Sequence, residues 1–400
     1  MSRNPRSQSA RPSSRASFDC FAVAAPGLEQ LVARELDALG IDNRVSIGGA
    51  AFSGGLEALV RANLWLRTGS RVLVRVAAFR AQAFHELERL ARALPWERFL
   101  RPGAAVRLRV TSHKSRLYHT GGIAQRLLQA IEHRLGRPSA LVGSGADDHD
   151  AEFEEAQLFV IRVAHDGFTV SADSSGALLH RRGYRQAVAK APLRETLAAA
   201  MLLRAGWNGS TALIDPMCGS GTIPIEGALI ARRIAPGLSR DFAFSRWPEV
   251  HVMVLERERE RALSMALPKA PSTILGSDRD PGAIEAAAAN AARANVSADV
   301  DLSVRPLSAI QAIGDVGVVA TNPPYGVRVG EARRLRDLYA RLGQLLRSRF
   351  AGWDLAVLSA DPRLDRELKL ALQEELATRN GGIAVRLLVG RVAATRAAGH

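Results

Sequence analysis

Residues 322–325 offer the most direct chemistry in the chain, because an apolar segment runs straight into Asn-Pro-Pro-Tyr. The amide oxygen of Asn322 and the carbonyl of Pro323 are two hydrogen-bond acceptors, and the rings of Pro323 and Pro324 restrict the backbone that carries them. Two fixed acceptors can bind both hydrogens of a planar amino group, while Tyr325 offers a ring for stacking. The pattern predicts a pocket for a nucleobase amine; the alternative is a proline-rich turn after a strand.

A second candidate site follows an apolar segment that ends at Asp215. The loop after it contributes six candidate ligand-binding residues: Pro216, Cys218, Gly219, Ser220, Gly221 and Thr222. Its glycines allow the backbone to approach a ligand closely, and the start of the next helix favours an anionic group such as a carboxylate. A dinucleotide-binding loop would need a third glycine at position 224, where the chain has Pro224, and an acid about 20 residues further on. The spacing therefore argues against a nicotinamide cofactor.

The next acid that ends an apolar segment is Asp278, far outside that spacing. A carboxylate at the end of a parallel strand can still bind the hydroxyl groups of a ribose. Glu226, in the helix after the loop, is interpreted as a structural residue that caps or pairs within the fold. The ordered set of loop, acid and Asn-Pro-Pro-Tyr is more specific than any one of these motifs.

Length and composition limit the possible functions. The chain has 400 residues, 47% of them hydrophobic, which suits two or three packed domains. Its net charge of +14 predicts a nucleic-acid partner, because neutralised phosphates release counterions; an arginine-rich composition without such a partner is the alternative. No apolar run reaches the ~18 residues of a membrane span. Cys20 and Cys218 are too few for a zinc site, so we expect no metal and a reducing, cytoplasmic setting.

We expect four parts along the chain. Residues 1–17 read as a disordered basic tail, residues 18–81 and 82–175 as two small α/β units, and residues 176–395 as alternating strands and helices around a doubly wound parallel sheet. Asp166-Gly167 between two apolar segments predicts a hairpin. The carboxyl ends of parallel strands meet at one edge, where ligands bind.

The expected elements follow from apolar periodicity and from Gly, Pro and Asp signals. Strands are predicted at 18–24, 44–52, 71–77, 105–111, 158–163, 168–172, 317–321, 353–359 and 383–389, and helices at 28–39, 123–135 and 281–295. Asp280 and Pro281 are predicted to cap and begin the last of these helices.

Two basic segments could contact a phosphate backbone. Residues 113–120, His-Lys-Ser-Arg-Leu-Tyr-His-Thr, interleave basic residues with an aromatic one, and a solvated loop is the alternative. Residues 180–185, His-Arg-Arg-Gly-Tyr-Arg, lie at the start of the last domain, where interdomain packing and salt bridges are the alternative. The sequence leaves both questions open.

The three motifs, in this order, resemble those of class I S-adenosylmethionine-dependent methyltransferases. Three further segments, 179–185, 191–200 and 352–359, are similar to RNA guanine-N2 methyltransferases that carry a THUMP domain. Within that family the chain resembles the N-terminal half of bifunctional bacterial enzymes that modify 23S ribosomal RNA. The resemblance runs from about Phe18 to Val392. Because the chain stops at His400, we expect one catalytic half.

The resemblance implies a Rossmann-like domain with a seven-stranded, mostly parallel sheet at 176–395, preceded by a ferredoxin-like domain at 18–81 and a THUMP RNA-binding domain at 82–175. It implies S-adenosyl-L-methionine as cofactor. Asp278 would bind the ribose, the backbone of Asp215 to Thr222 would line the methionine part, and Thr196 would lie near it. The catalytic residues would be Asn322, Pro323, Pro324 and Tyr325.

One departure from the family concerns the adenine of the cofactor. Such enzymes carry an acid after the third strand that binds the adenine amine, and here Pro306 or Leu307 stands in its place. Ser308, a backbone group or a water would have to substitute. Adenine recognition is therefore the part of the site that the sequence explains least.

The function that the resemblance implies is methyl transfer to the N2 amine of a guanine in RNA, first of all 23S rRNA. Three alternatives remain. The first keeps the reaction and takes tRNA as substrate. The second is methylation of adenine N6 or cytosine N4, whose amines fit the same acceptors. The third is a non-catalytic RNA-binding factor in ribosome assembly.

Overall fold

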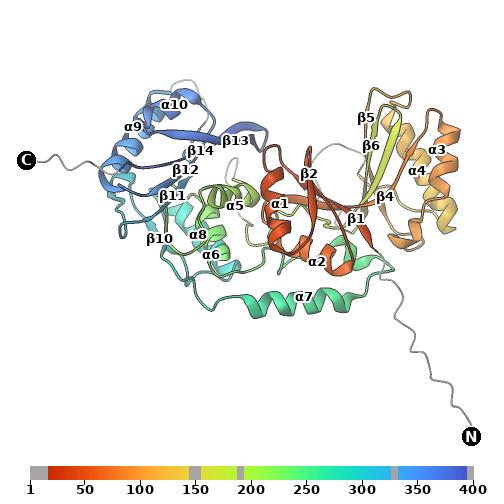
Figure 1. Cartoon of the computed structure of the whole chain (residues 1–400), viewed down its shortest axis with the longest axis horizontal. Helices are drawn as coiled ribbons and strands as arrows, with labels where there is room; N and C mark the ends of the chain where they lie inside the picture. Colours follow the sequence, from red (N-terminus) through yellow and green to blue (C-terminus); the bar gives the residue numbers. More distant parts are fainter. Residues whose placement is uncertain (1–16, 144–154, 187–192, 326–331, 394–400) are drawn as a thin grey trace, which may run out of the picture.

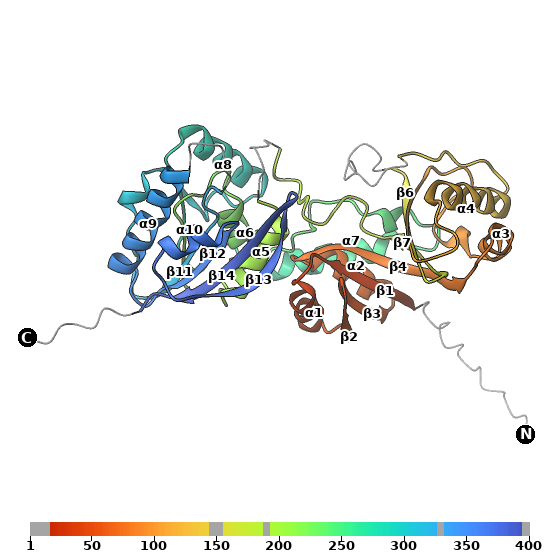
Figure 2. The ribbon, with the colours of Figure 1, turned by 90° about the horizontal axis from the view of Figure 1, so that it is seen from above.

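The structure of the chain is a computed structural model that describes residues 17–143, 155–186, 193–325 and 332–393. These residues form two seven-stranded sheets, one in each of two lobes that lie side by side (Figure 1). Figure 2 shows the same two lobes from above, with segments of the chain running between them.

The N-terminal lobe holds a sheet with the strand order β2-β3-β1-β4-β7-β6-β5. Its strands are β1 (Phe18–Ala24), β2 (Asn43–Ser46), β3 (Gly49–Gly54), β4 (Gly69–Arg80), β5 (Val106–His113), β6 (Gln157–Ala164) and β7 (Gly167–Asp173). Its helices are α1 (Glu29–Ala38), α2 (Leu56–Trp65), α3 (Phe84–Arg92) and α4 (Thr120–Leu135).

Strand β4 is shared by the two halves of this sheet. It pairs antiparallel with β1 and, over its later residues, antiparallel with β7. The two α/β units expected on either side of residue 81 therefore lie in one continuous sheet. Their boundary stays a prediction.

The hairpins of this lobe correct the sequence analysis in detail. The single strand expected at 44–52 is wrong: β2 and β3 form an antiparallel pair, and Gly48 makes the turn with a φ of +83° that glycine tolerates. The hairpin expected at Asp166-Gly167 is confirmed, with Ala164 paired to Gly167. Its turn residues are His165 and Asp166, both with positive φ, as a type I′ turn requires.

The C-terminal lobe holds a sheet with the order β10-β9-β8-β11-β12-β14-β13. Its strands are β8 (Ala212–Asp215), β9 (Ile274–Asp278), β10 (Asp301–Val304), β11 (Gly317–Thr321), β12 (Asp354–Ser359), β13 (Leu372–Asn380) and β14 (Ile383–Arg391). Its helices are α5 (Glu195–Arg204), α6 (Thr222–Ala231), α8 (Pro281–Arg293), α9 (Ala332–Arg349) and α10 (Pro362–Glu367). Helix α7 (Val252–Met265), between α6 and β9 in the chain, packs instead against α2 of the N-terminal lobe, where Arg257 pairs with Glu57 at 2.7 Å (Figure 1). β14 runs antiparallel to its neighbours and the strands from β10 to β12 are parallel, so the expected seven-stranded, mostly parallel sheet is confirmed.

Alternate residues of the central strands face two different cores. In β11, Val318 and Ala320 belong to a core that includes α5, α6 and the N-terminal lobe. Val319 belongs to a second core with Tyr339 and Leu342 of α9. The strand is apolar throughout because both faces of a parallel sheet are covered.

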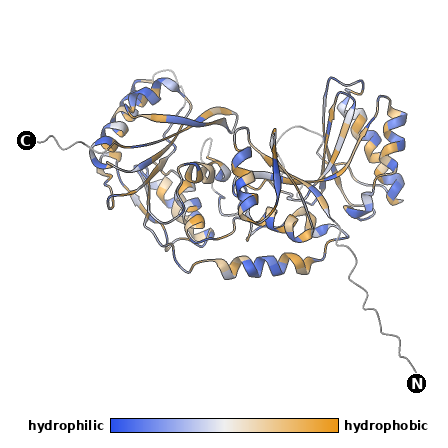
Figure 3. Ribbon diagram, in the orientation of Figure 1, coloured by the Kyte–Doolittle hydropathy of each residue, from blue (hydrophilic) through white to orange (hydrophobic). Residues whose placement is uncertain are grey.

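Helix ends and polarity explain which helices could be predicted. In α8 the Gly282 N–H donates to Asp280 Oδ1 at 2.9 Å and Pro281 is the first residue, as expected. Helix α7 was not predicted, because its repeated Glu-Arg pairs make it largely hydrophilic (Figure 3). None of the described helices combines the length and the apolarity needed to cross a membrane.

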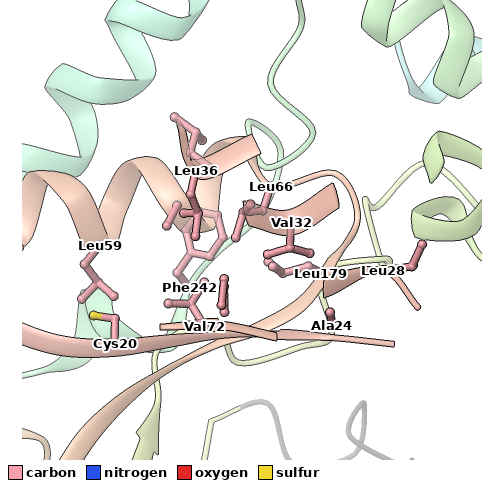
Figure 4. Packing of buried hydrophobic residues seen from close by; sticks show 14 of the residues in the cluster. Cys20, Ala24, Leu28, Val32, Leu36, Leu59, Leu66, Val72, Leu179 and Phe242 are labelled. Atoms are coloured by element: carbon pink, nitrogen blue, oxygen red, sulfur yellow. The ribbon is translucent and has the colours of Figure 1, made fainter. Parts of the chain in front are cut away.

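The two lobes share a packed joint. We call residues 174–194, between β7 and α5, the linker. Figure 4 shows Leu179 of the linker and Phe242, from the segment after α6, among core residues of the N-terminal lobe. The guanidinium of Arg67, just after α2, donates to the carbonyls of Leu229 (3.3 Å) and Ile234 (2.6 Å) in the C-terminal lobe. Apolar packing and hydrogen bonds therefore hold the lobes together.

Gly343, in the middle of α9, packs against the backbone that follows α10. A Cβ added there would lie 2.0 Å from the carbonyl oxygen of Leu368. Alanine is favoured over glycine inside a helix by about 1 kcal/mol, but this overlap outweighs the preference. We expect Gly343→Ala to lower the free energy of unfolding by about 1–3 kcal/mol, as overpacking does, in urea unfolding experiments.

Gly282→Ala in α8 is the matched control. A Cβ there has its nearest neighbour at 3.4 Å, Asp280 Oδ1, so stability should stay unchanged or rise slightly. Equal losses in the two variants would contradict the packing argument.

Candidate active site

Three neighbouring parallel strands end at the same edge of the second sheet. Strand β8 pairs with β9 on one side and with β11 on the other. Their last residues are Asp215, Asp278 and Thr321, and Asn322 follows directly. The structure thus brings the three motifs of the sequence together at one edge.

The loop after β8 turns back over the end of β9. The Cys218 N–H donates to the Ser277 carbonyl at 2.9 Å, and the Gly219 N–H donates to Asp278 Oδ2 at 3.0 Å. Beside Gly219, with φ +52°, no other described atom lies within 4 Å of the place where a Cβ would stand. The loop therefore offers backbone next to open space, which a ligand can fill.

The two carboxylates at this edge differ in burial. Burial raises the pKa of Asp215 to about 7, and the nearby carboxylate of Asp278 raises it slightly further. A hydrogen bond from the Met217 N–H (3.2 Å) lowers this pKa, but by less than burial raises it. Asp278 is partly exposed, and its two oxygens accept from the N–H groups of Gly219 and Asp280, both at 3.0 Å. These two donors orient the Asp278 carboxylate at the mouth of the loop.

The side-chain oxygen of Asn322 is buried and accepts no hydrogen bond within the described part of the chain. A buried acceptor without a partner is rare and costs about 1–3 kcal/mol, so it is available to a ligand donor. Tyr325 lies beside it: burial raises the pKa of its phenol, and the side-chain amide groups of Asn380 and Asn322, which donate to the phenol oxygen, lower it by less. Pro323 is buried and Pro324 is exposed.

Asn380, the last residue of β13, was not found from the sequence. It is 1% exposed, its Oδ1 accepts from the Arg194 N–H (3.3 Å) and its Nδ2 donates to the Tyr325 hydroxyl (3.1 Å). Its place before two glycines signals a hairpin turn, but not this contact. Asn290 was missed too: it donates to the Ser220 carbonyl (2.9 Å) from an alanine-rich helix whose pattern indicates only a helix.

The other candidates lie around the same edge. Pro216, Ser220, Gly221 and Thr222 complete the turn from β8 into α6. Cys218 is buried, and burial raises the pKa of its thiol, which fits a packed residue and not a nucleophile. Thr196 is buried in the first turn of α5, two residues after the contact between Arg194 and Asn380. Pro306 and Leu307 follow β10, and Ser308 beside them is exposed.

Glu226 pairs within the fold, as the sequence analysis interpreted it. It is fully buried in α6, where it accepts from the Arg182 guanidinium (3.4 Å) and from the Tyr184 hydroxyl (3.2 Å). Both partners come from the linker after β7. In the described ranges, no group of three or more His, Cys, Asp or Glu residues is placed to hold a metal ion.

The profile of a family described as "RMKL-like, methyltransferase domain" matches residues 182–388, just over half of the chain. The chain belongs to this family. A second profile, described as "RlmL ferredoxin-like domain", matches residues 19–73. The resemblance to a methyltransferase family and the ferredoxin-like unit at the N-terminus are therefore confirmed. The THUMP domain expected at 82–175 stays a prediction.

Individual relatives agree with the family. The ribosomal RNA large subunit methyltransferase K/L of Syntrophotalea carbinolica is 39% identical over 387 residues, which cover 92% of the chain and 53% of that protein. The chain spans about half the length of the curated relatives that it matches first.

Two solved structures are similar over nearly the whole chain. A candidate methyltransferase in complex with SAH (S-adenosylhomocysteine) is 31% identical with a TM-score of 0.84, covering 96% of this chain and 100% of that one. A protein named as a predicted N6-adenine-specific DNA methylase, from Listeria monocytogenes, is 34% identical with a TM-score of 0.82, covering 93% and 96%.

We expect Glu226→Ala to lower the free energy of unfolding by about 3–5 kcal/mol, because it leaves the buried Arg182 guanidinium without its carboxylate. Urea unfolding followed by circular dichroism measures this. In the control, Glu249→Ala breaks an exposed pair with Arg98 (2.8 Å) and should cost about 1 kcal/mol or less. A Glu226 variant as stable as this control would show that the buried pair contributes nothing.

Proposed function

We propose that the chain binds S-adenosylmethionine and transfers its methyl group to the N2 amine of a guanine in RNA. The RNA that we propose as substrate is 23S ribosomal RNA. The observation that carries the proposal is the buried, unpartnered oxygen of Asn322 at the edge that also holds the Asp215 loop and Asp278. An amine hydrogen is the partner that this oxygen lacks. Membership in a methyltransferase family and the name of the S. carbinolica relative support methyl transfer to RNA.

The residues along the loop fit the proposed cofactor. The oriented, partly exposed carboxylate of Asp278 can accept hydrogen bonds from two ribose hydroxyls. The open backbone at Gly219 gives the methionine part room against the loop from 215 to 222, and we place Thr196 near that part. A structural relative in complex with SAH supports this assignment. For the adenine, we propose the exposed Ser308, which follows Leu307 directly, in place of the acid that the family carries at this point.

When bound, S-adenosylmethionine would supply a methyl group on a positively charged sulfur: in-line attack by the amine forms the N–CH3 bond, breaks the S–CH3 bond and leaves a neutral thioether, and the methylated nitrogen then releases one proton to solvent. The chain's part is to present that amine. Asn322 Oδ1 and the Pro323 carbonyl accept its two hydrogens and stabilise the positive charge that develops on nitrogen. Tyr325, held by Asn380, stacks on the base after it leaves its helix.

The N-terminal lobe supports RNA as the partner. Residues 113–120 lead from the end of β5 to the start of α4, and among them Lys114 and Arg116 are exposed and Tyr118 is 78% exposed. Asp166, in the β6–β7 turn, accepts from the Arg116 N–H at 2.7 Å and orders this loop. A basic, ordered loop with an exposed ring suits a phosphate backbone and a stacked base.

A second candidate is methylation of an adenine N6 amine. That amine also has two hydrogens for Asn322 and Pro323, and the solved relative named as an N6-adenine-specific methylase favours it. The two candidates predict different modified nucleosides, N2-methylguanosine and N6-methyladenosine. Identifying the product therefore decides between them, and using rRNA and tRNA in parallel decides the substrate.

We expect purified protein with S-adenosylmethionine and unmodified 23S rRNA to form N2-methylguanosine, detected by nucleoside mass spectrometry. Asn322→Ala should lower kcat by about 100-fold or more, as the loss of a positioned transition-state acceptor does. Its cofactor affinity in calorimetry should stay close to that of the wild type, because Asn322 faces the amine.

The control is Asn208→Ala, an exposed asparagine that bonds only to Ser210 in the described structure and should keep wild-type turnover. Full turnover by the Asn322 variant would remove this residue from the mechanism. N6-methyladenosine as the product would replace guanine by the second candidate.

Asp278→Ala should weaken S-adenosylmethionine binding by at least about tenfold, or ~1.4 kcal/mol, because it removes the acceptor for the ribose hydroxyls. Isothermal titration calorimetry measures this directly. Asp301→Ala, an exposed acid at the first residue of β10 and so at the opposite end of the sheet, serves as control and should bind normally. Unchanged affinity in the Asp278 variant would reject the ribose assignment.

A further inference from the structure

A cavity of about 570 Å³ lies where the linker after β7 meets the C-terminal lobe. Its walls come from linker residues between 176 and 185, from Glu195 at the start of α5, and from residues between 239 and 246. The linker wall carries the basic segment 180–185, for which the sequence left phosphate contact and interdomain packing open.

Part of this basic wall serves packing. Arg240 donates to three carbonyls of the linker, at 2.6 to 2.8 Å. Arg182 donates to the carbonyl of Arg67 in the N-terminal lobe (2.6 Å), and Arg185 bonds to the carboxylate of Glu195 (3.1 Å). These guanidiniums hold the wall in place and keep their positive charge beside the cavity.

Two residues of the wall are not used in this way. The side chain of Arg181 is partly exposed and, among the described residues, makes no hydrogen bond or ion pair. Next to it, the pKa of His180 is lowered to about 3, first by burial and then by four arginines, among them Arg181 and Arg194. The imidazole is therefore neutral at pH 7, and the positive charges of these four arginines act on it.

The two carboxylates of the cavity do not neutralise this charge. Glu195 is bonded to Arg185, and burial raises its pKa to about 7 despite that pair. Asp241 has a side chain that is 95% exposed, 3.7 Å from Arg259. The cavity is thus open, polar and positively charged, which is the environment that a phosphate group requires.

The cavity is connected to the candidate active site through a short chain of contacts. Glu195 lines the cavity, and the N–H of its neighbour Arg194 donates to Asn380, which donates in turn to the Tyr325 hydroxyl. The start of α5 thus lines the cavity through Glu195 and is linked to Tyr325 through Arg194 and Asn380.

We propose that this cavity binds a phosphodiester group of the RNA substrate, close to the nucleotide whose base reaches Asn322, with Arg181 and His180 as its donors. The inference rests on the proposed function and names a contact that positions its substrate. The linker then does two things at once: Arg182 joins the lobes and Arg185 holds the linker to the start of α5, while Arg181 and His180 face the RNA.

The test compares Arg181→Gln with a charge-matched control, Arg44→Gln. Arg44 is an exposed arginine on β2, the edge strand of the first sheet. RNA affinity is measured by fluorescence anisotropy over a series of salt concentrations. We expect Arg181→Gln to weaken RNA binding about fivefold to tenfold and to reduce the salt slope by about one unit, as the loss of one phosphate contact does. The control should match the wild type.

Two further measurements separate this proposal from others. Thermal unfolding and S-adenosylmethionine affinity of Arg181→Gln should equal those of the wild type, because the bond from Arg240 uses only the backbone carbonyl of Arg181, which the substitution keeps. Inorganic phosphate, titrated by calorimetry, should bind weakly compared with RNA. Tight binding of free phosphate, with RNA affinity indifferent to Arg181, would make the cavity a small-anion site and overturn the RNA contact.

The failures are distinguishable. If the wild type binds and methylates RNA but Arg181→Gln has the same affinity and salt slope, the cavity proposal is overturned and the proposed function stands. Equal losses in the Arg181 and Arg44 variants would indicate unspecific attraction and also overturn it. A wild type that neither binds nor methylates RNA would overturn both.

Discussion

The parallel pairing of β9, β8 and β11 is the constraint on which the candidate site depends. Because the three strands run in the same direction, their carboxyl ends meet at one edge, and the loops that follow converge there. Close packing maintains the alignment: a Cβ on Gly317 at the start of β11 would lie 2.4 Å from the Trp353 ring, and one on Gly276 in β9 would lie 2.7 Å from Leu302. Asp278 and Asn322 lie at the same edge only while this order holds.

Buried arginines connect that sheet to the rest of the molecule. Arg67 and Arg182 donate to carbonyls across the joint, and Arg182 also pairs with Glu226 of α6. In the N-terminal lobe, Arg71 pairs with the buried carboxylate of Asp173 at the end of β7, where the linker begins. A guanidinium has five donors in a rigid plane, so it can satisfy several carbonyls of a segment that has no regular secondary structure. These contacts hold the part of the linker before residue 187 in place.

Negative and positive side chains gather in different parts of the described chain. At the sheet edge the carboxylates of Asp215 and Asp278 lie next to the loop, where a cationic cofactor would be stabilised. At the joint and at the corner of the N-terminal lobe, arginines and Lys114 lie next to cavity or solvent, where a polyanion would be stabilised. Asn380 stands between the two regions, in contact with Arg194 and Tyr325.

The sequence by itself determined the class of the fold and the three motifs, because apolar alternation, glycines and prolines act on neighbouring residues. It also determined local ends such as the Asp280 cap. It did not reveal β13 or α7, nor that the strand predicted at 71–77 is shared by both halves of the first sheet, since these features depend on what packs against them. Only the tertiary structure decided that Asn322 Oδ1 has no partner among the described residues and that Asn380 donates to Tyr325. It also decided that Arg182 is buried at the joint while the side chain of the neighbouring Arg181 is partly exposed beside the cavity. Such facts join residues far apart in the chain, and burial and hydrogen bonding between them exist only once the chain has folded.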